Sequence, residues 1–281
     1  SAGLAVRDGD HLAQVVKAKG RLSNLSEKTD SGKALKGTCG IGHTRWATHG
    51  EPSQINAHPH VSGNCERSGS GTVESEVVGV HNGIIENYTE LKEKLLKHGY
   101  TFYSDTDTEV VIKLVDYYYK KYNLGPIDAI AKTMVRVRGS YALELMFKDY
   151  PGEIWVARKD SPMIIGIADG ETYVASDVPA ILKYTRNVYY IGNLEIAEMT
   201  SEEVHFYNID REEIQKEMTE IKWDAESAEK GGYEHFMLKE IHEQPKAIRD
   251  TLNSVVKDGV IDFTDIDITE EEIKKLSLIH I

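Results

Sequence analysis

Four short runs decide the fold class: YALELMF at 141–147, IWVAR at 154–158, PMIIGIA at 162–168 and TYVAS at 172–176. Their β-branched and aromatic residues favour strands. The intervening segments DYPG at 149–152 and DG at 169–170 contain residues typical of tight turns. The four runs therefore predict an antiparallel meander.

Helices are expected before these runs, and further strands after them. The first helix is predicted to begin at a capping box, NYTE at 87–90, and to end near Gly99; the second begins near Thr106 and the third at Pro126. After a short helix at 178–184, strands are expected at 188–192, 195–199 and 204–209. Because strands and helices come in separate blocks, we predict an α+β fold with antiparallel sheets.

The composition argues against several classes of protein. The 33 Lys and Arg residues are outnumbered by 46 Asp and Glu, and the net charge of −13 repels nucleic acid and anionic membrane surfaces. No run approaches the roughly 18 apolar residues of a membrane span. With only two cysteines, a disulfide framework is not expected and a reducing compartment is favoured. We therefore predict a folded cytoplasmic protein that binds neither nucleic acid nor membrane.

Two polar segments are predicted to connect folded parts. Residues 63–76 are rich in Gly, Ser and Glu and are expected to form an exposed loop without chemistry. Residues 211–233 are polar and end in a Gly-Gly pair, which is typical of a connection before a helix at 234–257. Both ends of the chain are strand-like, at 1–6 and in LSLIHI at 276–281, so we expect truncation at both.

Three stretches carry the candidate chemistry: HTRWATHG at 43–50, HNGIIEN at 81–87 and SDTDTE at 104–109. The first is dense in polar donors and is expected to enclose a small polar ligand. Arg45 offers a planar fork suited to a carboxylate, although a surface cation beside a core aromatic, Trp46, is the structural alternative.

The second stretch allows two interpretations of Asn82 and Gly83. A type I′ turn is the usual use of Asn-Gly. However, apolar residues resume at Ile84 and a helix follows, so no partner strand is expected at hairpin distance. The Asn82 amide and the Gly83 N–H could instead stabilise an oxyanion.

Asp107, in the third stretch, also has two interpretations. A carboxylate at a helix start is favoured by the unpaired N–H groups and the helix dipole. Opposite Arg45, it would alternatively hold an α-ammonium while Arg45 holds the α-carboxylate of the same molecule.

These motifs resemble a known family. HTRWATHG, NAHPH at 56–60, HNGIIENY and TDTE, in this order, are similar to the glutaminase domain of glutamine–fructose-6-phosphate aminotransferases (isomerizing), also called glucosamine-6-phosphate synthases. The likeness continues through ARKDSPMIIG at 157–166, ASD at 175–177 and EHFMLKEIHEQP at 234–245, and so covers nearly the whole chain.

The resemblance implies a class II glutamine amidotransferase with the four-layer αββα sandwich of N-terminal nucleophile hydrolases. It implies a glutaminase domain at 1–222 that lacks its opening strand and helix, a linker at 223–233, and the start of a sugar isomerase domain at 234–281. It also implies L-glutamine as substrate and no cofactor. Fructose 6-phosphate and a homodimer are implied only for the full-length parent.

The resemblance further implies residue roles. Arg45 and Asp107 would grip the amino-acid end of glutamine, and Asn82 and Gly83 would form the oxyanion hole. The other implied pocket residues lie in HTRWATHG: Trp46 on a loop that closes over glutamine, with Thr48 and His49 in the pocket wall.

The family's nucleophile is an N-terminal cysteine whose α-amino group is the base, and residue 1 here is Ser. Cys39 leads directly into His43 and Arg45 and is expected to be a buried strand thiol, whereas Cys65 lies in the acidic loop and is expected to be inert. The chain is therefore expected to bind glutamine without hydrolysing it efficiently. A non-catalytic glutamine-binding module is the alternative.

A metal-dependent hydrolase is a further alternative, because His43, His49, His58, His60 and His81 occur within the first third of the chain. No Asp, Glu or Cys stands at a supporting spacing, so we expect no metal site.

Overall fold

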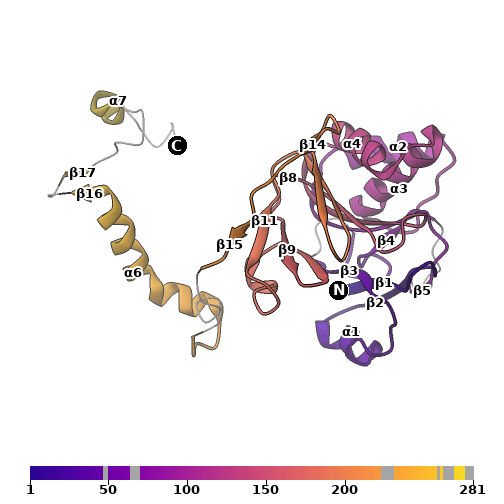
Figure 1. Cartoon of the computed structure of the whole chain (residues 1–281), viewed down its shortest axis with the longest axis horizontal. Coiled ribbons are helices and arrows are strands. Elements are labelled where there is room, and N and C mark those ends of the chain that lie inside the picture. The colour runs from indigo at the N-terminus through magenta and orange to yellow at the C-terminus, as the bar shows by residue number, and fades with distance from the viewer. Residues whose placement is uncertain (47–49, 64–69, 223–230, 258–259, 262–268, 276–281) are drawn as a thin grey trace. The chain divides into compact units, whose positions relative to one another are not determined.

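The computed structural model describes residues 1–281 except 47–49, 64–69, 223–230, 258–259, 262–268 and 276–281 (Figure 1). Two compact units are present, Ser1–Lys222 and Trp223–Ile281. All the candidate chemistry lies in the first unit.

A seven-stranded antiparallel sheet forms the centre of the first unit. Its longest pairing joins β6 to β7, from Val77 opposite Phe147 to Ile85 opposite Gly139. The strand order is β14 (Glu213–Ile214), β13 (Val204–Tyr207), β12 (Glu195–Met199), β8 (Ile154–Lys159), β7 (Gly139–Phe147), β6 (Val77–Ile85) and β4 (His60–Val61).

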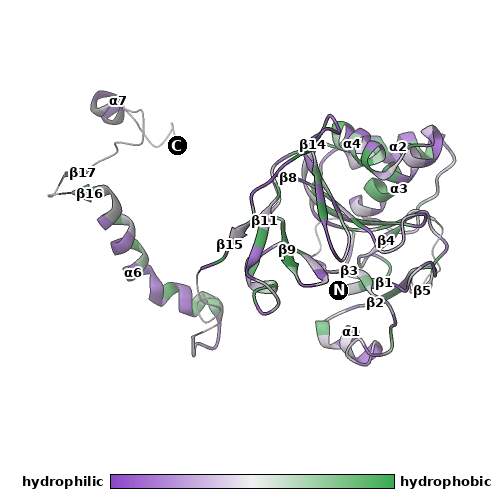
Figure 2. Ribbon diagram, viewed as in Figure 1, coloured by the Kyte–Doolittle hydropathy of each residue, from purple (hydrophilic) through white to green (hydrophobic). Residues whose placement is uncertain are grey.

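Three helices cover one face of this sheet: α2 (Tyr88–Lys97), α3 (Asp107–Tyr122) and α4 (Pro126–Arg136) (Figure 1). Alternate residues of β7, such as Leu143 and Leu145, pack with Ile112 and Ile130 of the helices in one apolar cluster. Figure 2 shows the apolar colour along α3. The helix α3 is therefore the central helix of this layer.

Two four-stranded sheets cover the opposite face. The first has the order β3 (Cys39–Thr44), β1 (Ala2–Arg7), β2 (Gln14–Ala18) and β5 (Gly71–Thr72). The second has the order β10 (Glu171–Ala175), β9 (Ile164–Ala168), β11 (Asn187–Tyr190) and β15 (Thr219–Glu220). Ala142 and Met146, which alternate with the helix-facing leucines of β7, pack against these sheets.

The fourth layer is α1 (Leu22–Lys28), whose Leu25 packs on Ala2 and Ala18 of the first small sheet. Arg7 fixes this small sheet to the large one, because its guanidinium donates to the carbonyls of Phe147 and Lys148 at 2.7 and 2.6 Å. The α+β class, the antiparallel sheets and the αββα layering are thus confirmed.

The second unit contains α6 (Phe236–Val255), β16 (Val256–Lys257), β17 (Val260–Ile261) and α7 (Glu270–Lys275). The helix expected at 234–257 is therefore confirmed. Across the residues that the structure describes, no helix combines the length and the apolar character needed to cross a membrane. The strand expected at 276–281 lies outside the described residues.

The meander prediction was wrong. The hairpins β7–β8 and β9–β10 both form, but β8 pairs next with β12 and β9 pairs next with β11, so the two hairpins belong to different sheets. Between β8 and β9, Asp160 has a positive φ of 58° and Pro162 has no N–H to donate to a ladder. At this point the chain leaves one layer for the other.

Three local predictions also need correction. Asn87 does not close a capping box; its side chain donates to the Arg136 carbonyl and accepts from the Arg138 N–H, both at 2.9 Å. Residues 71–72 form β5, and Val73 and Ser75 are buried, so this part of 63–76 is not an exposed loop. The helix expected at 178–184 is a single 3₁₀ turn over Val178–Ala180.

Candidate functional site

The three motif stretches meet at one cavity of about 1010 Å³ in the first unit. Its walls come from β1, β3, β6, β7, β10 and the start of α3. The predicted site residues that line it are Arg45, Trp46, Asn82, Gly83 and Asp107. Thr48 and His49, also predicted, lie outside the described residues.

Arg45 follows β3 directly and is only 8% exposed. Its guanidinium donates to the Gly50 carbonyl at 3.1 Å and to the Glu51 carbonyl at 3.4 Å, and these bonds hold the Arg45 side chain in place. Removal from water lowers the pKa of Arg45, and the Asp107 carboxylate opposes this effect. The interpretation of Arg45 as a surface cation is therefore wrong.

Asp107 is the first residue of α3 and is buried. The cap is supplied instead by Thr106, whose hydroxyl accepts from the Glu109 N–H at 3.2 Å. The Asp107 carboxylate accepts from the Ile85 N–H at 2.9 Å, and this bond joins the helix start to the end of β6. Asp107 thus lies in the first turn, where the helix dipole favours a carboxylate, but it is not the capping residue, and its carboxylate is fixed at the cavity wall.

Buried histidines support the same helix start. The Thr108 hydroxyl pairs with His58 Nε2 at 3.1 Å and with His81 Nδ1 at 3.2 Å. The ring of His43 stacks on that of His58, with centroids 4.6 Å apart. Removal from water lowers the pKa of His43 to about 4, and it holds the pKa of His58 well below 6.5. The rings of His43 and His58 are therefore neutral near neutral pH.

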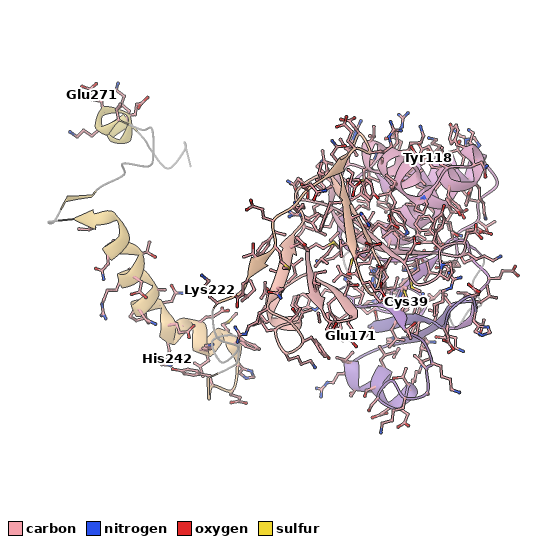
Figure 3. The ribbon with its side chains drawn as sticks, in the orientation of Figure 1. Cys39, Tyr118, Glu171, Lys222, His242 and Glu271 are labelled. Atoms are coloured by element: carbon pink, nitrogen blue, oxygen red, sulfur yellow. The ribbon has the colours of Figure 1, made fainter. Side chains whose placement is uncertain are left out.

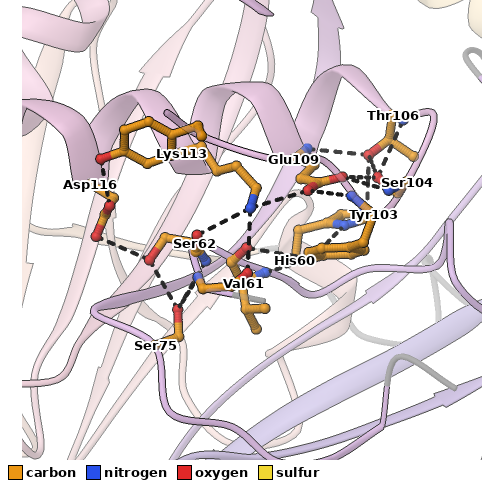
Figure 4. Close-up of polar contacts among 12 residues, drawn as sticks. His60, Val61, Ser62, Ser75, Tyr103, Ser104, Thr106, Glu109, Lys113 and Asp116 are labelled. Atoms are coloured by element: carbon orange, nitrogen blue, oxygen red, sulfur yellow. Dashed lines mark hydrogen bonds and ion pairs between the residues drawn. The ribbon is translucent and has the colours of Figure 1, made fainter. Parts of the chain in front are cut away.

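A buried ionic network lies one turn further along α3 (Figure 4). The Glu109 carboxylate accepts from the N–H groups of Tyr103 and Ser104, at 3.0 and 2.7 Å, and lies 3.3 Å from Lys113 Nζ. Lys113 also donates to the Ser62 carbonyl at 3.1 Å. Both charged side chains are essentially inaccessible to water, so the network fixes the segment before Asp107 in one conformation.

Asn82 and Gly83 lie inside β6 rather than in a turn. The type I′ turn interpretation was therefore wrong, and their partner residues are Ala142 and Tyr141 of β7. Gly83 has a φ of +136°, and a Cβ added to it would lie 2.2 Å from the Ser140 carbonyl oxygen. Only glycine fits here, because the conformation and the close β7 backbone both exclude a side chain.

Trp46 is 90% exposed, so it is not a core aromatic.

Cys39, labelled in Figure 3, is buried at the start of β3, and burial raises the pKa of its thiol. The prediction that Cys39 is a buried strand thiol is therefore confirmed. Cys65 lies outside the described residues. In the described part of the chain, no group of three or more His, Cys, Asp or Glu residues is arranged to hold a metal ion.

Comparison with known proteins shows which proteins this chain resembles. The family model for a glutamine amidotransferase domain matches residues 69–183. Two relatives are each 50% identical to this chain: the glutamine–fructose-6-phosphate aminotransferases (isomerizing) of Caldanaerobacter subterraneus subsp. tengcongensis and of Clostridium acetobutylicum. The likeness covers 100% of this chain and 44% of each relative. The chain is therefore similar to glutamine amidotransferases, and the match to their domain model lies within its first unit. The chain spans less than half the length of these curated relatives.

Solved structures agree with the amidotransferase fold. The glutamine phosphoribosylpyrophosphate amidotransferase of B. subtilis, complexed with ADP and GMP, has 25% identity and a TM-score of 0.59, over 74% of this chain and 42% of that one. A glutamine aminotransferase class-II domain protein of Silicibacter pomeroyi has 11% identity and a TM-score of 0.50, over 74% and 90%. The second likeness concerns the fold alone.

Several polar residues in and around this cavity were not found from the sequence. His58 and His60 were considered only as metal ligands, although they contact Thr108 and Thr106 at the start of α3. Glu144 also lines the cavity and was not singled out. The available signal was a charged residue within the otherwise apolar run YALELMF.

Proposed function

We propose that this chain binds L-glutamine in the cavity and is the glutamine-hydrolysing, ammonia-supplying part of an aminotransferase. The parent enzyme would make glucosamine 6-phosphate from fructose 6-phosphate and glutamine. The observation that carries this proposal is the position of Arg45, Asp107 and the Asn82-Gly83 pair around one cavity.

The charges of the cavity suit a free amino acid. A guanidinium forms paired, charge-assisted hydrogen bonds with a carboxylate, and the carboxylate of Asp107 attracts an ammonium. Both groups are held by backbone contacts, Arg45 at the 50–51 carbonyls and Asp107 at the Ile85 N–H, so little ordering is needed on binding. We therefore assign the α-carboxylate of glutamine to Arg45 and its α-ammonium to Asp107.

The carboxamide end of glutamine is assigned to Asn82 and Gly83. Thiolate attack on this carbonyl would give a tetrahedral oxyanion, which the Asn82 amide and the Gly83 N–H would stabilise before ammonia leaves. A γ-glutamyl thioester would remain for water to cleave. No cysteine occurs among the cavity-lining residues of the described chain, so we propose glutamine binding, and not efficient hydrolysis, for this chain by itself.

Calorimetric titration with L-glutamine tests the assignment. Arg45→Ala is expected to weaken binding by about 2 kcal/mol, or about 30-fold, because a bidentate charge-assisted pair is lost. Arg158→Ala is the matched control, because the Arg158 guanidinium is held by the Ile191 carbonyl and Asn193 and does not line the cavity. Equal affinities in both variants, each with a cooperative melting transition, would refute the proposal.

A non-catalytic glutamine-binding module is the second candidate, and it is favoured by the same lack of a cavity cysteine. Measuring fructose 6-phosphate-dependent glutamine consumption by the full-length parent separates the two, since a binding module consumes none. We further propose that the parent is a cytoplasmic homodimer; its sedimentation in solution tests the second part of that statement.

A further inference from the structure

Glu144 is an acidic residue in the middle of a central strand. The neighbouring Leu143 and Leu145 pack under the helices, so Glu144 faces the opposite side of the sheet with Ala142 and Met146. On that side it lines the cavity. The carboxyl group thus lies on the face of the large sheet that the small sheets cover.

The Glu144 carboxyl has neither a hydrogen bond nor an ion pair with any residue in the described parts of the chain. Removal from water, rather than a neighbouring charge, raises its pKa to about 8. Glu144 is only partly exposed, and a carboxyl that lines a cavity without a partner in the described residues is typical of a group that meets a ligand. The other titratable or charged groups that line the cavity are His43, Arg45, His58, His81, Asp107 and Tyr173.

The carboxyl lies close to the residues assigned to the carboxamide of glutamine. In the β6–β7 register, Val80 is opposite Glu144 and Asn82 is opposite Ala142. Asn82 and Glu144 are therefore diagonal neighbours on the same face, with Cα atoms about 7 Å apart. A molecule leaving the carboxamide position can reach Glu144 without leaving the cavity.

We propose that the Glu144 carboxyl binds ammonia, or a small primary amine, inside this cavity. The proton of the neutral carboxyl moves to the nitrogen lone pair: an O–H bond breaks, an N–H bond forms, and a carboxylate–ammonium pair results. The ammonia source rests on the proposed function, since it is the carboxamide of glutamine. An ammonium suits the site because its N–H groups can donate to the Glu144 carboxylate and to the Asn82 side-chain oxygen.

The direct test is a pH titration of Glu144. The titration is monitored by NMR on protein labelled with ¹³C at the side-chain carboxyl carbon of glutamate. The signal absent from Glu144→Gln identifies the residue. Ammonium chloride is expected to lower the titration midpoint, because the ligand binds the ionised form. The midpoint should fall by about one pH unit when ammonium is present at ten times its Kd. Potassium chloride at equal concentration should leave it unchanged, because potassium has no N–H to donate.

Three results would overturn the proposal: a midpoint in the ordinary range near pH 4.3, no response to ammonium, or an equal response to potassium. Glu153→Gln is the matched control, because the pKa of Glu153 is also raised but its side chain does not line the cavity. This variant should retain the full ammonium response of Glu144. Methylammonium chloride serves as a second probe and should act in the same direction.

Failure of the proposed function would look different. If the chain binds no L-glutamine but Glu144 still responds to ammonium and not to potassium, the amine site stands and the glutamine assignment falls. If glutamine binds through Arg45 but Glu144 does not respond, only the amine site falls.

Discussion

The substitution Gly83→Ala tests the backbone geometry of the site. The new Cβ would lie 2.2 Å from the Ser140 carbonyl oxygen and 3.0 Å from the Tyr141 Cα, both in the backbone of β7, which cannot rotate away. The φ of +136° adds strain of about 1–3 kcal/mol, and forcing an atom into packed backbone adds about 1–3 kcal/mol. The expected destabilisation is therefore about 4 kcal/mol.

Thermal unfolding measures this effect. For a unit of this size, about 4 kcal/mol corresponds to a fall in Tm of about 12 °C. Gly152→Ala is the matched control, because Gly152 also has a positive φ, of 79°, but no atom lies within 4 Å of the position that its new Cβ would take. It should cost only about 1 kcal/mol. Equal small losses in the two variants would refute the close approach of β6 to β7.

Two further predictions concern the buried polar groups. Glu109→Gln is expected to lower the free energy of unfolding in urea by about 3–5 kcal/mol, because the Lys113 ammonium then stays buried without its carboxylate partner. Glu90 is exposed, so the control variant Glu90→Gln should change the free energy of unfolding by less than about 0.5 kcal/mol. Similar losses in the two variants would contradict a buried Glu109–Lys113 ion pair. The free energy of unfolding should also fall as the pH drops below about 6.5, because the unfolded chain binds protons that the histidines of the folded protein do not. His43, whose pKa is lowered to about 4, should by itself account for a loss of about 3 kcal/mol between pH 6.5 and pH 4. A His43→Asn variant that keeps the full loss of stability in acid would count against this cause.

The sequence predicted local elements well and their assembly less well. The helices at α3 and α4 begin where their caps and Pro126 indicated, because these signals act within a few residues. The sheet to which a strand belongs is not a local property. The β8 and β9 runs have similar apolar patterns, so nothing in them indicates that the chain changes layers at Asp160. Asn87 failed as a cap because its amide bonds with residues 49 and 51 positions away.

For the candidate site, too, the sequence predicted local features better than tertiary contacts. The motifs predicted that Arg45, Asn82, Gly83 and Asp107 bind one small molecule; the structure shows that all four line one cavity, and their roles stay a prediction. Their supports could not be predicted, since the contacts of Glu109 and of the histidines depend on tertiary packing. Gly83 illustrates the difference: the sequence suggested a turn or an oxyanion role, whereas the contact with β7 is visible only in three dimensions.

A crystal structure of the chain with L-glutamine bound would test the central assignment most directly. The account predicts the α-carboxylate within hydrogen-bonding distance of the Arg45 guanidinium, the α-ammonium against Asp107, and the side-chain carbonyl oxygen towards Asn82 and Gly83. Glutamine bound elsewhere, or bound in this cavity with its α-carboxylate away from Arg45, would contradict it.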